Sequence, residues 1–322
     1  EPDHHIQPCD QYARKMYQMG RAVCKAVYLR EQLDSLFAQT VQDFHLYVSD
    51  DASTDSTVDI VRVYQARFPD RITLSQRTTN SGGAWQNYFG LMIACRDDYV
   101  MLCDQDDVWL PDKIAVTLDC MRTMEQRYGA DTPLLLHTDL TLTDENLRVT
   151  FPSYRRAMCS LFERTRLEHA LIQNTFAGCS CMYNRALAEL IYAAPAYCVM
   201  HDWWLMIVAA AFGHIGFSYQ ATALYRQHGT NRIGACDMST LSYKLGRLLH
   251  PVAVKHAIDI TYRQAREFLS MYHSRLLKRQ LRLIQTYCRV PAISKPGKII
   301  TLLRLGTIKN TWTRRLGHFL FV

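Results

Sequence analysis

Between residues 43 and 126 the sequence alternates between strand-like and helix-like segments. Strand-like runs lie at 43–49, 71–75, 99–103 and 133–137, and helix-like runs lie at 56–68, 83–95 and 111–128. This βαβ order predicts an α/β fold with a parallel sheet between layers of helices. After residue 139, a hairpin tip at 144–146 and strand-like runs at 177–183 and 215–219 predict a mixed second half.

The composition is that of a chain that can bury a large hydrophobic core. It has 322 residues, of which 48% are hydrophobic and 21% are charged. The longest apolar stretch, 203–212, is shorter than the roughly 20 residues that span a bilayer, so we expect no transmembrane helix. The first residues lack the pattern of an export signal, and the missing initial Met hints at a fragment.

The eleven cysteines form no C-x-x-C pair, which favours a reduced, cytosolic protein over a disulfide framework. Charge is distributed unevenly along the chain. Residues 241–322 contain 16 Lys and Arg against two acidic residues, a net charge of +14. We predict a basic helical extension over 238–322. The segment 274–284 could place leucines and charges on opposite helix faces and lie on an anionic membrane; the alternative is an extension packed on the catalytic domain. No motif for binding nucleic acid accompanies the charge.

Carboxylates follow the apolar run 99–103 at once, in Asp104-Gln105-Asp106-Asp107. Active sites of parallel α/β sheets lie at this end of the strands. Three carboxylates within four residues repel one another unless a divalent cation or another positive group compensates them. The alternative is a solvated turn in which Asp107 caps the helix after Pro111.

Two further polar segments follow predicted strands. In 50–55, Asp50 and Asp51 are candidates to bind a base or ribose, whereas Asp55 is expected to cap the next helix. In 80–87, Asn80 and the paired glycines Gly82 and Gly83 precede a helix. Backbone amides in such a loop can approach an anion.

The third and fourth segments lie in the second half of the chain. In His201-Asp202-Trp203-Trp204, Asp202 either caps a helix or acts as a base whose proton affinity is raised by the tryptophans, which also offer a stacking surface for a sugar. In 225–231, His228 is a candidate metal ligand, and Arg226 could offset phosphate charge.

Taken in this order, these segments resemble family 2 glycosyltransferases with the GT-A fold, in particular the bacterial rhamnosyltransferase-like branch. The resemblance covers residues 28–234. The segments that carry it are 33–40, 50–55, 103–109, 201–204 and 225–229. It implies a Rossmann-like mixed sheet flanked by helices. We therefore predict a GT-A domain over 27–237, between an atypical segment 1–26 and the basic extension 238–322.

The resemblance also implies roles for individual residues. Asp202 would be the catalytic base that deprotonates the acceptor hydroxyl. Asp106, in the D-x-D motif, and His228 would hold the divalent metal, Mn²⁺ or Mg²⁺. The donor nucleotide-sugar would be bound by Asp50, Asp51, Asn80, Gly82 and Asp104, and the acceptor side would be formed by Asn174, Gly178, Trp203 and Trp204.

The implied activity is an inverting transfer of a sugar, with rhamnose from dTDP-rhamnose as the leading donor. The acceptor would be a cell-surface polysaccharide such as O-antigen, or a lipid-linked saccharide. The location would be cytoplasmic, with peripheral contact at the inner face of the plasma membrane through the basic C-terminal region. A nucleotidyltransferase is the second interpretation, but it would have no use for Asp202 and would need a Lys-containing phosphate loop near its N-terminus.

The N-terminal segment departs from the family pattern, because residues 11–25 contain no apolar run. We therefore expect the first strand of the sheet to be missing or replaced, which would leave neighbouring backbone groups unpaired. A shifted reading frame or an alternative start over residues 1–26 would explain the change. An inactive or binding-only relative of the family is the third interpretation.

Overall fold

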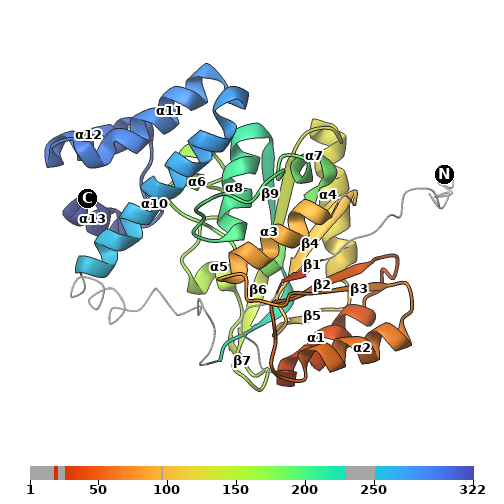
Figure 1. Cartoon of the computed structure of the whole chain (residues 1–322). Coiled ribbons are helices and arrows are strands. Elements are labelled where there is room, and N and C mark those ends of the chain that lie inside the picture. Colours follow the sequence, from red (N-terminus) through yellow and green to blue (C-terminus); the bar gives the residue numbers. More distant parts are fainter. Residues whose placement is uncertain (1–17, 21–25, 96, 229–250) are drawn as a thin grey trace, which may run out of the picture.

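A mixed β-sheet with helices on both faces forms the centre of the computed structural model, which describes residues 18–20, 26–95, 97–228 and 251–322 (Figure 1). The strands are β1 Gln18–Gly20, β2 Leu46–Asp50, β3 Ile72–Gln76, β4 Tyr99–Cys103, β5 Val108–Trp109, β6 Leu134–Thr143, β7 Val149–Phe151, β8 Cys181–Asn184 and β9 His214–Arg226. Within the described residues the sheet has nine strands, in the order β3-β2-β1-β4-β8-β6-β9-β5, and β7 pairs with β6.

Strand β1 lies inside the sheet, where a first strand was predicted to be missing. It pairs in parallel with β2, where Gln18 lies opposite Tyr47, and with β4, where Met19 lies opposite Cys103. The strand is therefore not missing, because pairing between two strands needs only backbone N–H and C=O groups and can be made by three residues without an apolar run. The other alternative, a replaced strand, and the shifted-frame hypothesis that rests on the sequence pattern stay predictions.

The long helices of the first half are α1 Ala26–Phe37, α2 Thr57–Arg67, α3 Ala84–Ala94 and α4 Lys113–Tyr128. Of these, α2, α3 and α4 agree with the predicted segments to within two residues at either end, whereas α1 was not predicted. Asp55 accepts hydrogen bonds from the Thr57 N–H at 3.1 Å and the Thr57 hydroxyl at 2.6 Å, so it stabilises the start of α2 as predicted.

Side chains of the central strands alternate between two hydrophobic cores, one on each face of the sheet. In β4, Val100 and Leu102 belong to the core that also contains buried residues of α3 and α8, whose bounds are His201–Phe212. Met101 and Cys103 belong to the core on the side of α1 and α2. This period of two is expected for a strand buried on both faces.

The second half contains the predicted hairpin and several short helices. Strands β6 and β7 pair in antiparallel fashion across the turn at 144–148. The strand predicted at 177–183 starts later, because the 3₁₀ turn η1 Gly178–Ser180 precedes β8. The short helices are α5 Tyr154–Ala157, α6 Leu167–Ala170 and α7 Arg185–Ala188.

The C-terminal part is helical and packs on the sheet domain (Figure 1). Its helices are α10 Pro251–Tyr272, α11 Lys278–Arg289, α12 Lys295–Leu305 and α13 Trp312–Phe321, with the 3₁₀ turns η2 His273–Arg275 and η3 Val290–Ala292. Ile284 and Tyr287 of α11 are fully buried, and the Tyr287 hydroxyl lies 2.7 Å from the Thr261 hydroxyl of α10. Ile284, at the end of the segment 274–284, is therefore part of the hydrophobic core, which agrees with the alternative of an extension packed on the catalytic domain. Among the described residues, no helix is both long and apolar enough to cross a membrane.

Candidate active site

The predicted acidic turn lies between β4 and β5, at the carboxyl end of β4. Asp106 and Asp107 are buried, with 8% and 0% of their surface exposed, and Asp104 is partly exposed. Asp107 accepts the backbone N–H of Arg226 at 3.2 Å, which ties the turn to the end of β9. Asp107 does not cap the helix after Pro111, because the residue before α4 is Asp112.

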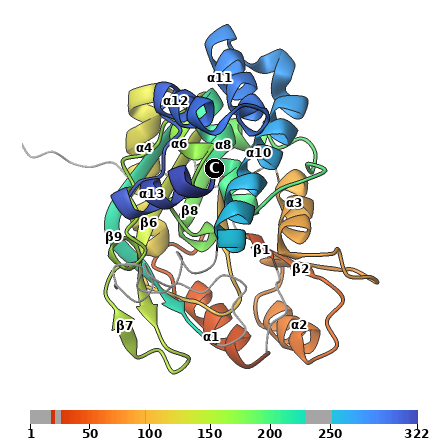
Figure 2. The same cartoon turned by 90° about the vertical axis from the view of Figure 1, so that its left-hand side faces the viewer.

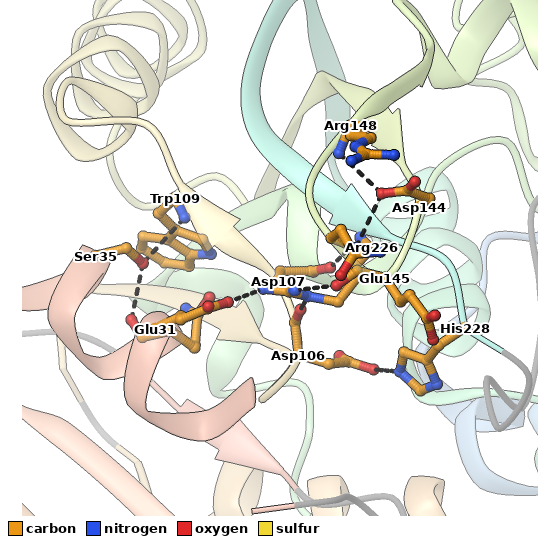
Figure 3. A network of polar contacts seen from close by, with 12 residues as sticks. Glu31, Ser35, Asp106, Asp107, Trp109, Asp144, Glu145, Arg148, Arg226 and His228 are labelled. Atoms are coloured by element: carbon orange, nitrogen blue, oxygen red, sulfur yellow. Dashed lines mark hydrogen bonds and ion pairs between the residues drawn. The ribbon is translucent and has the colours of Figure 1, made fainter. Parts of the chain in front are cut away.

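Asp106 and His228, the two predicted metal ligands, lie next to each other (Figure 3). The His228 Nε2 atom is 2.8 Å from Asp106 Oδ2, and the side chains are only 6% and 12% exposed. The imidazole also stacks on the ring of Tyr28, with the ring centroids 5.1 Å apart. The fold therefore joins two residues that are 122 positions apart in the sequence.

Arg226 fixes this turn through its guanidinium group (Figure 3). Its Nε donates to the Asp106 carbonyl at 2.8 Å, its Nη1 donates to the Glu145 carbonyl at 2.6 Å, and its Nη2 forms an ion pair with Glu31. The residue is 2% exposed. The protein's own acceptors thus occupy the guanidinium, and its predicted role in offsetting phosphate charge stays a prediction.

Burial and mutual repulsion raise the proton affinity of the acidic turn. The pKa of Asp104 is raised to about 7, first by burial and then by the charge of Asp106. Burial and the charges of Asp106 and Asp104 raise the pKa of Asp107 well above its usual range. Such a group of carboxylates is stabilised in its charged form by a nearby cation.

Sequence reasoning missed two residues beside this turn. Ligand atoms of Asp104, Asp107 and Cys179 lie within 4.8 Å of one another. The Tyr88 hydroxyl of α3 lies 2.7 Å from Asp104 Oδ1 and 2.9 Å from the Cys103 carbonyl. The sequence around Cys179 shows only a close second cysteine, Cys181, and Tyr88 is indistinguishable there from an ordinary core aromatic residue.

The candidate nucleotide side lies at the carboxyl end of β2. Asp51 accepts the Ser81 N–H at 2.7 Å and the Ser81 hydroxyl at 2.9 Å. The Asn80 side chain donates to the Asp51 carbonyl at 3.3 Å and accepts the Gly82 N–H at 2.9 Å. Gly82 has φ +94°, which favours glycine. The predicted residues Asp51, Asn80 and Gly82 therefore lie together.

Asp50 faces its own loop rather than the 80–82 turn. Its carboxylate accepts the Ser53 N–H at 3.0 Å and the Ser53 hydroxyl, and the residue is 3% exposed. This arrangement fixes the loop that follows β2. The role predicted for Asp50 in binding the nucleotide stays a prediction.

Asp202 lies in the first turn of α8 and is 7% exposed. Burial raises the pKa of Asp202 to about 6, while hydrogen bonds from Trp203, Asn174 and Gly178 oppose the rise. The Trp203 N–H donates to Asp202 Oδ1 at 2.7 Å. At pH 7 the group is therefore mostly a carboxylate whose proton affinity is high enough for a general base.

Gly178 gives η1 the space to approach the start of α8. A Cβ atom at this position would lie 2.8 Å from His201 Nε2 and 3.3 Å from Asp202 Cβ. The predicted acceptor-side residues Asn174 and Gly178 both contact Asp202. His201 in turn stacks on Tyr88, with centroids 3.8 Å apart and an angle of 18° between the rings. Tyr88 therefore contacts both Asp104 and the residue that precedes Asp202.

The two tryptophans of this segment differ in position. Trp204 has no exposed surface and packs edge-on against Phe89 and Phe268, so it belongs to the core and presents no face to a sugar. This differs from the prediction, because the apolar side of α8 faces inward. Trp203 is partly exposed, and its indole N–H donates to the Ala170 carbonyl at 2.6 Å.

The fold is that of the GT-A class of glycosyltransferases. The family model of glycosyl transferase family 2 matches residues 23–190, and the chain belongs to that family. This assignment confirms the predicted family and disfavours the nucleotidyltransferase interpretation.

A sequence relative is the dTDP-rhamnosyl transferase RfbG of Shigella flexneri, which is 26% identical over 232 residues, covering 67% of this chain and 74% of RfbG. The chain covers 55% of the length of the mycobacterial relatives that it matches. In structure it is similar to S. aureus TarS 1-349 in complex with UDP-GlcNAc, with a TM-score of 0.53, 17% identity, and coverage of 95% of this chain and 87% of TarS. It is also similar to the mannosyltransferase PcManGT from Pyrobaculum calidifontis in complex with GDP-Man and Mn²⁺, with a TM-score of 0.51, 15% identity, and coverage of 95% and 90%. These structural likenesses show the fold.

Proposed function

We propose that the protein is an inverting, metal-dependent glycosyltransferase that uses a nucleoside-diphosphate sugar. The observation that carries the proposal is the position of Asp202, a buried carboxylate with a raised pKa, close enough to Asp104 for its charge to raise that group's pKa. In a single displacement with inversion, the base and the leaving group lie on opposite sides of the anomeric carbon. Asp202 as the base and the acidic turn as the site of the leaving diphosphate would suit this reaction. The carboxylates of the acidic turn and the base would both be needed for transfer.

In this mechanism Asp202 accepts the proton of the acceptor hydroxyl while that oxygen attacks the anomeric carbon. The bond from this carbon to the diphosphate oxygen breaks, and the nucleoside diphosphate leaves. Asn174 and Gly178 hold the Asp202 carboxylate through hydrogen bonds. Asp51, Asn80 and Gly82 form the turn proposed to bind the nucleotide.

The donor atoms of the acidic turn fit a divalent cation. Asp106 and His228 offer a carboxylate oxygen and an imidazole nitrogen 2.8 Å apart. The buried Asp107 Oδ2 atom has no nitrogen or oxygen partner among the described residues. We propose that Asp106 and His228 hold Mn²⁺ or Mg²⁺, with Asp104 binding the donor beside them. The ion would offset the negative charge that develops on the diphosphate.

Rhamnose is the proposed donor sugar because RfbG is a dTDP-rhamnosyl transferase. A cell-surface polysaccharide such as O-antigen, or a lipid-linked saccharide, is the proposed acceptor. We place the reaction in the cytoplasm, at the inner face of the plasma membrane. The cysteines recorded in the described part of the chain are free, which suits a reducing compartment.

A thermal-shift titration with UDP-, GDP- and dTDP-nucleotides, with and without Mn²⁺ or Mg²⁺, tests the donor site. We expect one nucleotide to raise the melting temperature only when metal is present. The shift should be lost in Asp106→Ala and kept in Asp202→Asn, whereas sugar transfer should be lost in both. A folded protein that no nucleotide stabilises would overturn the proposal in favour of an inactive relative.

A further inference from the structure

The outward side of α13 carries a stripe of exposed apolar side chains. Trp312, Leu316 and Leu320 are 72%, 45% and 47% exposed. Residues four positions apart lie on the same side of a helix, so these three form one continuous row. On another side of the helix His318 is 1% exposed. Helix α13 therefore packs on the protein along one side and presents an apolar row to its surroundings along another.

Helix α12 also carries exposed apolar side chains. Ile300 and Leu303 are 49% and 54% exposed. The start of α12 meets the end of α13, where Lys295 Nζ donates to the Leu320 carbonyl at 2.8 Å. Figure 2 shows both helices in front of the molecule, on the same side. We call the exposed residues 300, 303, 312, 316 and 320 the outer row.

The charged residues of the segment that carries the outer row have one sign. Residues 268–322 contain no Asp or Glu. From residue 295 onward the basic residues are Lys295, Lys298, Arg304, Lys309, Arg314 and Arg315. Glu168 of α6 lies beside Gly306 at the end of α12, but it is paired with Arg166 at 2.7 Å and only 14% of its side chain is exposed. Apolar side chains with a tryptophan, on helices whose own charged residues are all basic, match the boundary between acyl chains and anionic headgroups. An acidic protein surface would satisfy the charges but would leave the apolar row in water.

The outer row is connected to the proposed acceptor side of the site. Arg314 of α13 donates to the Met158 carbonyl at 2.9 Å, directly after α5. Tyr154, at the start of α5, is near enough to both Arg314 and Asp202 for their charges to change its pKa, in opposite directions. Helix α13 therefore adjoins α5, and α5 adjoins the Asp202 side of the site.

We propose that the outer row of α12 and α13 docks on an anionic lipid bilayer and thereby brings the Asp202 side of the site to acceptors anchored in that bilayer. The second half of this statement rests on the proposed function, and the first half does not. The surface differs from the segment 274–284 first suggested by the sequence, because Ile284 of α11 is buried. The partner is a lipid surface with net negative charge.

Vesicle co-sedimentation tests the docking without donor or acceptor. We expect the full chain to bind vesicles of phosphatidylcholine and phosphatidylglycerol, and to bind vesicles of phosphatidylcholine alone much more weakly. The double variant Leu316→Gln/Leu320→Gln should lose roughly tenfold in partitioning. The matched control Val63→Gln/Val149→Gln changes side chains that are 48% and 60% exposed on other elements, and it should bind as the unchanged protein does.

Tryptophan fluorescence supplies a second readout from the same vesicles. Lipids with brominated acyl chains should quench Trp312, and Trp312→Phe should remove most of that quenching. Equal binding by the leucine double variant and the control, or no preference for anionic vesicles, would overturn the proposal. A dimer in light scattering that becomes a monomer in Leu316→Gln/Leu320→Gln would also overturn it, because a second copy would then cover the outer row.

The catalytic part is tested separately, by transfer to a lipid-linked saccharide in vesicles and to a water-soluble saccharide. The leucine double variant should be slower with the first acceptor and unchanged with the second. Loss with both acceptors would contradict the link between docking and access. The nucleotide titration tests the proposed function, and vesicle binding tests the docking. The two can fail separately, because a protein can bind vesicles without binding nucleotide, or bind nucleotide without binding vesicles.

Discussion

Asp202 combines two properties that usually oppose each other, burial and a requirement for charge. Substitution Asp202→Asn keeps the shape and the oxygen that accepts the Trp203 N–H but removes the base. We expect kcat for sugar transfer to fall by about 10³-fold, within the range for loss of a general base, with nucleotide affinity unchanged. Steady-state kinetics with calorimetric titration of the nucleotide would check this. A variant that keeps most of its turnover would remove Asp202 from the mechanism.

The raised pKa of Asp202 also predicts opposite effects of pH on activity and on stability. Because the base must be ionised, kcat should fall as the pH drops through about 6. Protonated Asp202 binds its proton more tightly in the folded protein than in the unfolded chain. The stabilisation that this protonation gives to the fold is complete below the usual Asp pKa and is lost as the pH rises through about 6.

At pH 8, Asp202→Asn should therefore be more stable to urea than the unchanged protein by about 3 kcal/mol. The difference should disappear near pH 4. Urea unfolding of both proteins at the two pH values would measure it. A variant that is less stable at pH 8 would show that the hydrogen bonds to the carboxylate outweigh its burial.

Tyr88 is expected to position the donor site rather than to react. Tyr88→Phe removes the hydroxyl beside Asp104 and keeps the ring that stacks on His201. Donor KM should rise about tenfold with kcat little changed, which is the reverse of the pattern for Asp202→Asn. Tyr99→Phe is the matched control, because Tyr99 begins β4, at the opposite end of this strand from the acidic turn, and its hydroxyl donates to Glu125 of α4 at 2.7 Å. Equal effects of both changes would indicate a purely structural role.

At the scale of elements, the close approach of η1 to α8 depends on the glycine at position 178, which has no side chain. Gly178→Ala would place a Cβ 2.8 Å from His201 Nε2, so η1 or the start of α8 must move. We expect a stability loss of about 1–3 kcal/mol and a fall in kcat, since both hydrogen bonds from 174 and 178 to Asp202 would shift.

Gly317→Ala in α13 is the control for this substitution. A Cβ there meets nothing within 4 Å, and alanine favours a helix over glycine by about 1 kcal/mol. The control should therefore be slightly more stable than the unchanged protein and equally active on a soluble acceptor. Thermal melting and transfer assays on both variants would separate the two cases. Gly178→Ala with normal kinetics would show that the base tolerates movement of η1.

Much of the element pattern could be predicted from the sequence, because apolar periodicity reports burial directly. Strand β4 was predicted at its observed bounds, and α2 and α3 to within one residue. Strand β1 was missed since its three residues show no such period, and their pairing depends on strands far along the chain. The contact of Asp106 with His228 followed from a family motif, whereas the roles of Tyr88 and Arg226 depend on which faces the fold brings together.

At the scale of the whole molecule, the acidic site and the basic C-terminal residues lie on different parts of the protein. The acidic site lies at the ends of the strands, and the basic residues after 268 lie on the C-terminal helices, which pack against α8 (Figures 1 and 2). The sequence predicted an extension separate from a GT-A domain over 27–237. In the structure α10 and α8 share one hydrophobic core, in which Phe268 packs against Trp204.

This shared core predicts a single cooperative unfolding transition for the described parts of the chain. Phe268 is fully buried, and Phe268→Ala should reduce the free energy of unfolding by about 3–5 kcal/mol. Phe268 packs against Trp204, which belongs to the same helix as Asp202. The substitution should therefore lower the melting temperature of the whole protein, both with and without bound nucleotide. Calorimetry with and without nucleotide, together with circular dichroism and tryptophan fluorescence, would follow the transition by different probes.

If the C-terminal helices were an independent unit, two transitions would be seen and Phe268→Ala would lower only one of them. The sheet would then keep its nucleotide-dependent stabilisation at full strength, and the predicted boundary near residue 238 would mark a domain in the thermodynamic sense.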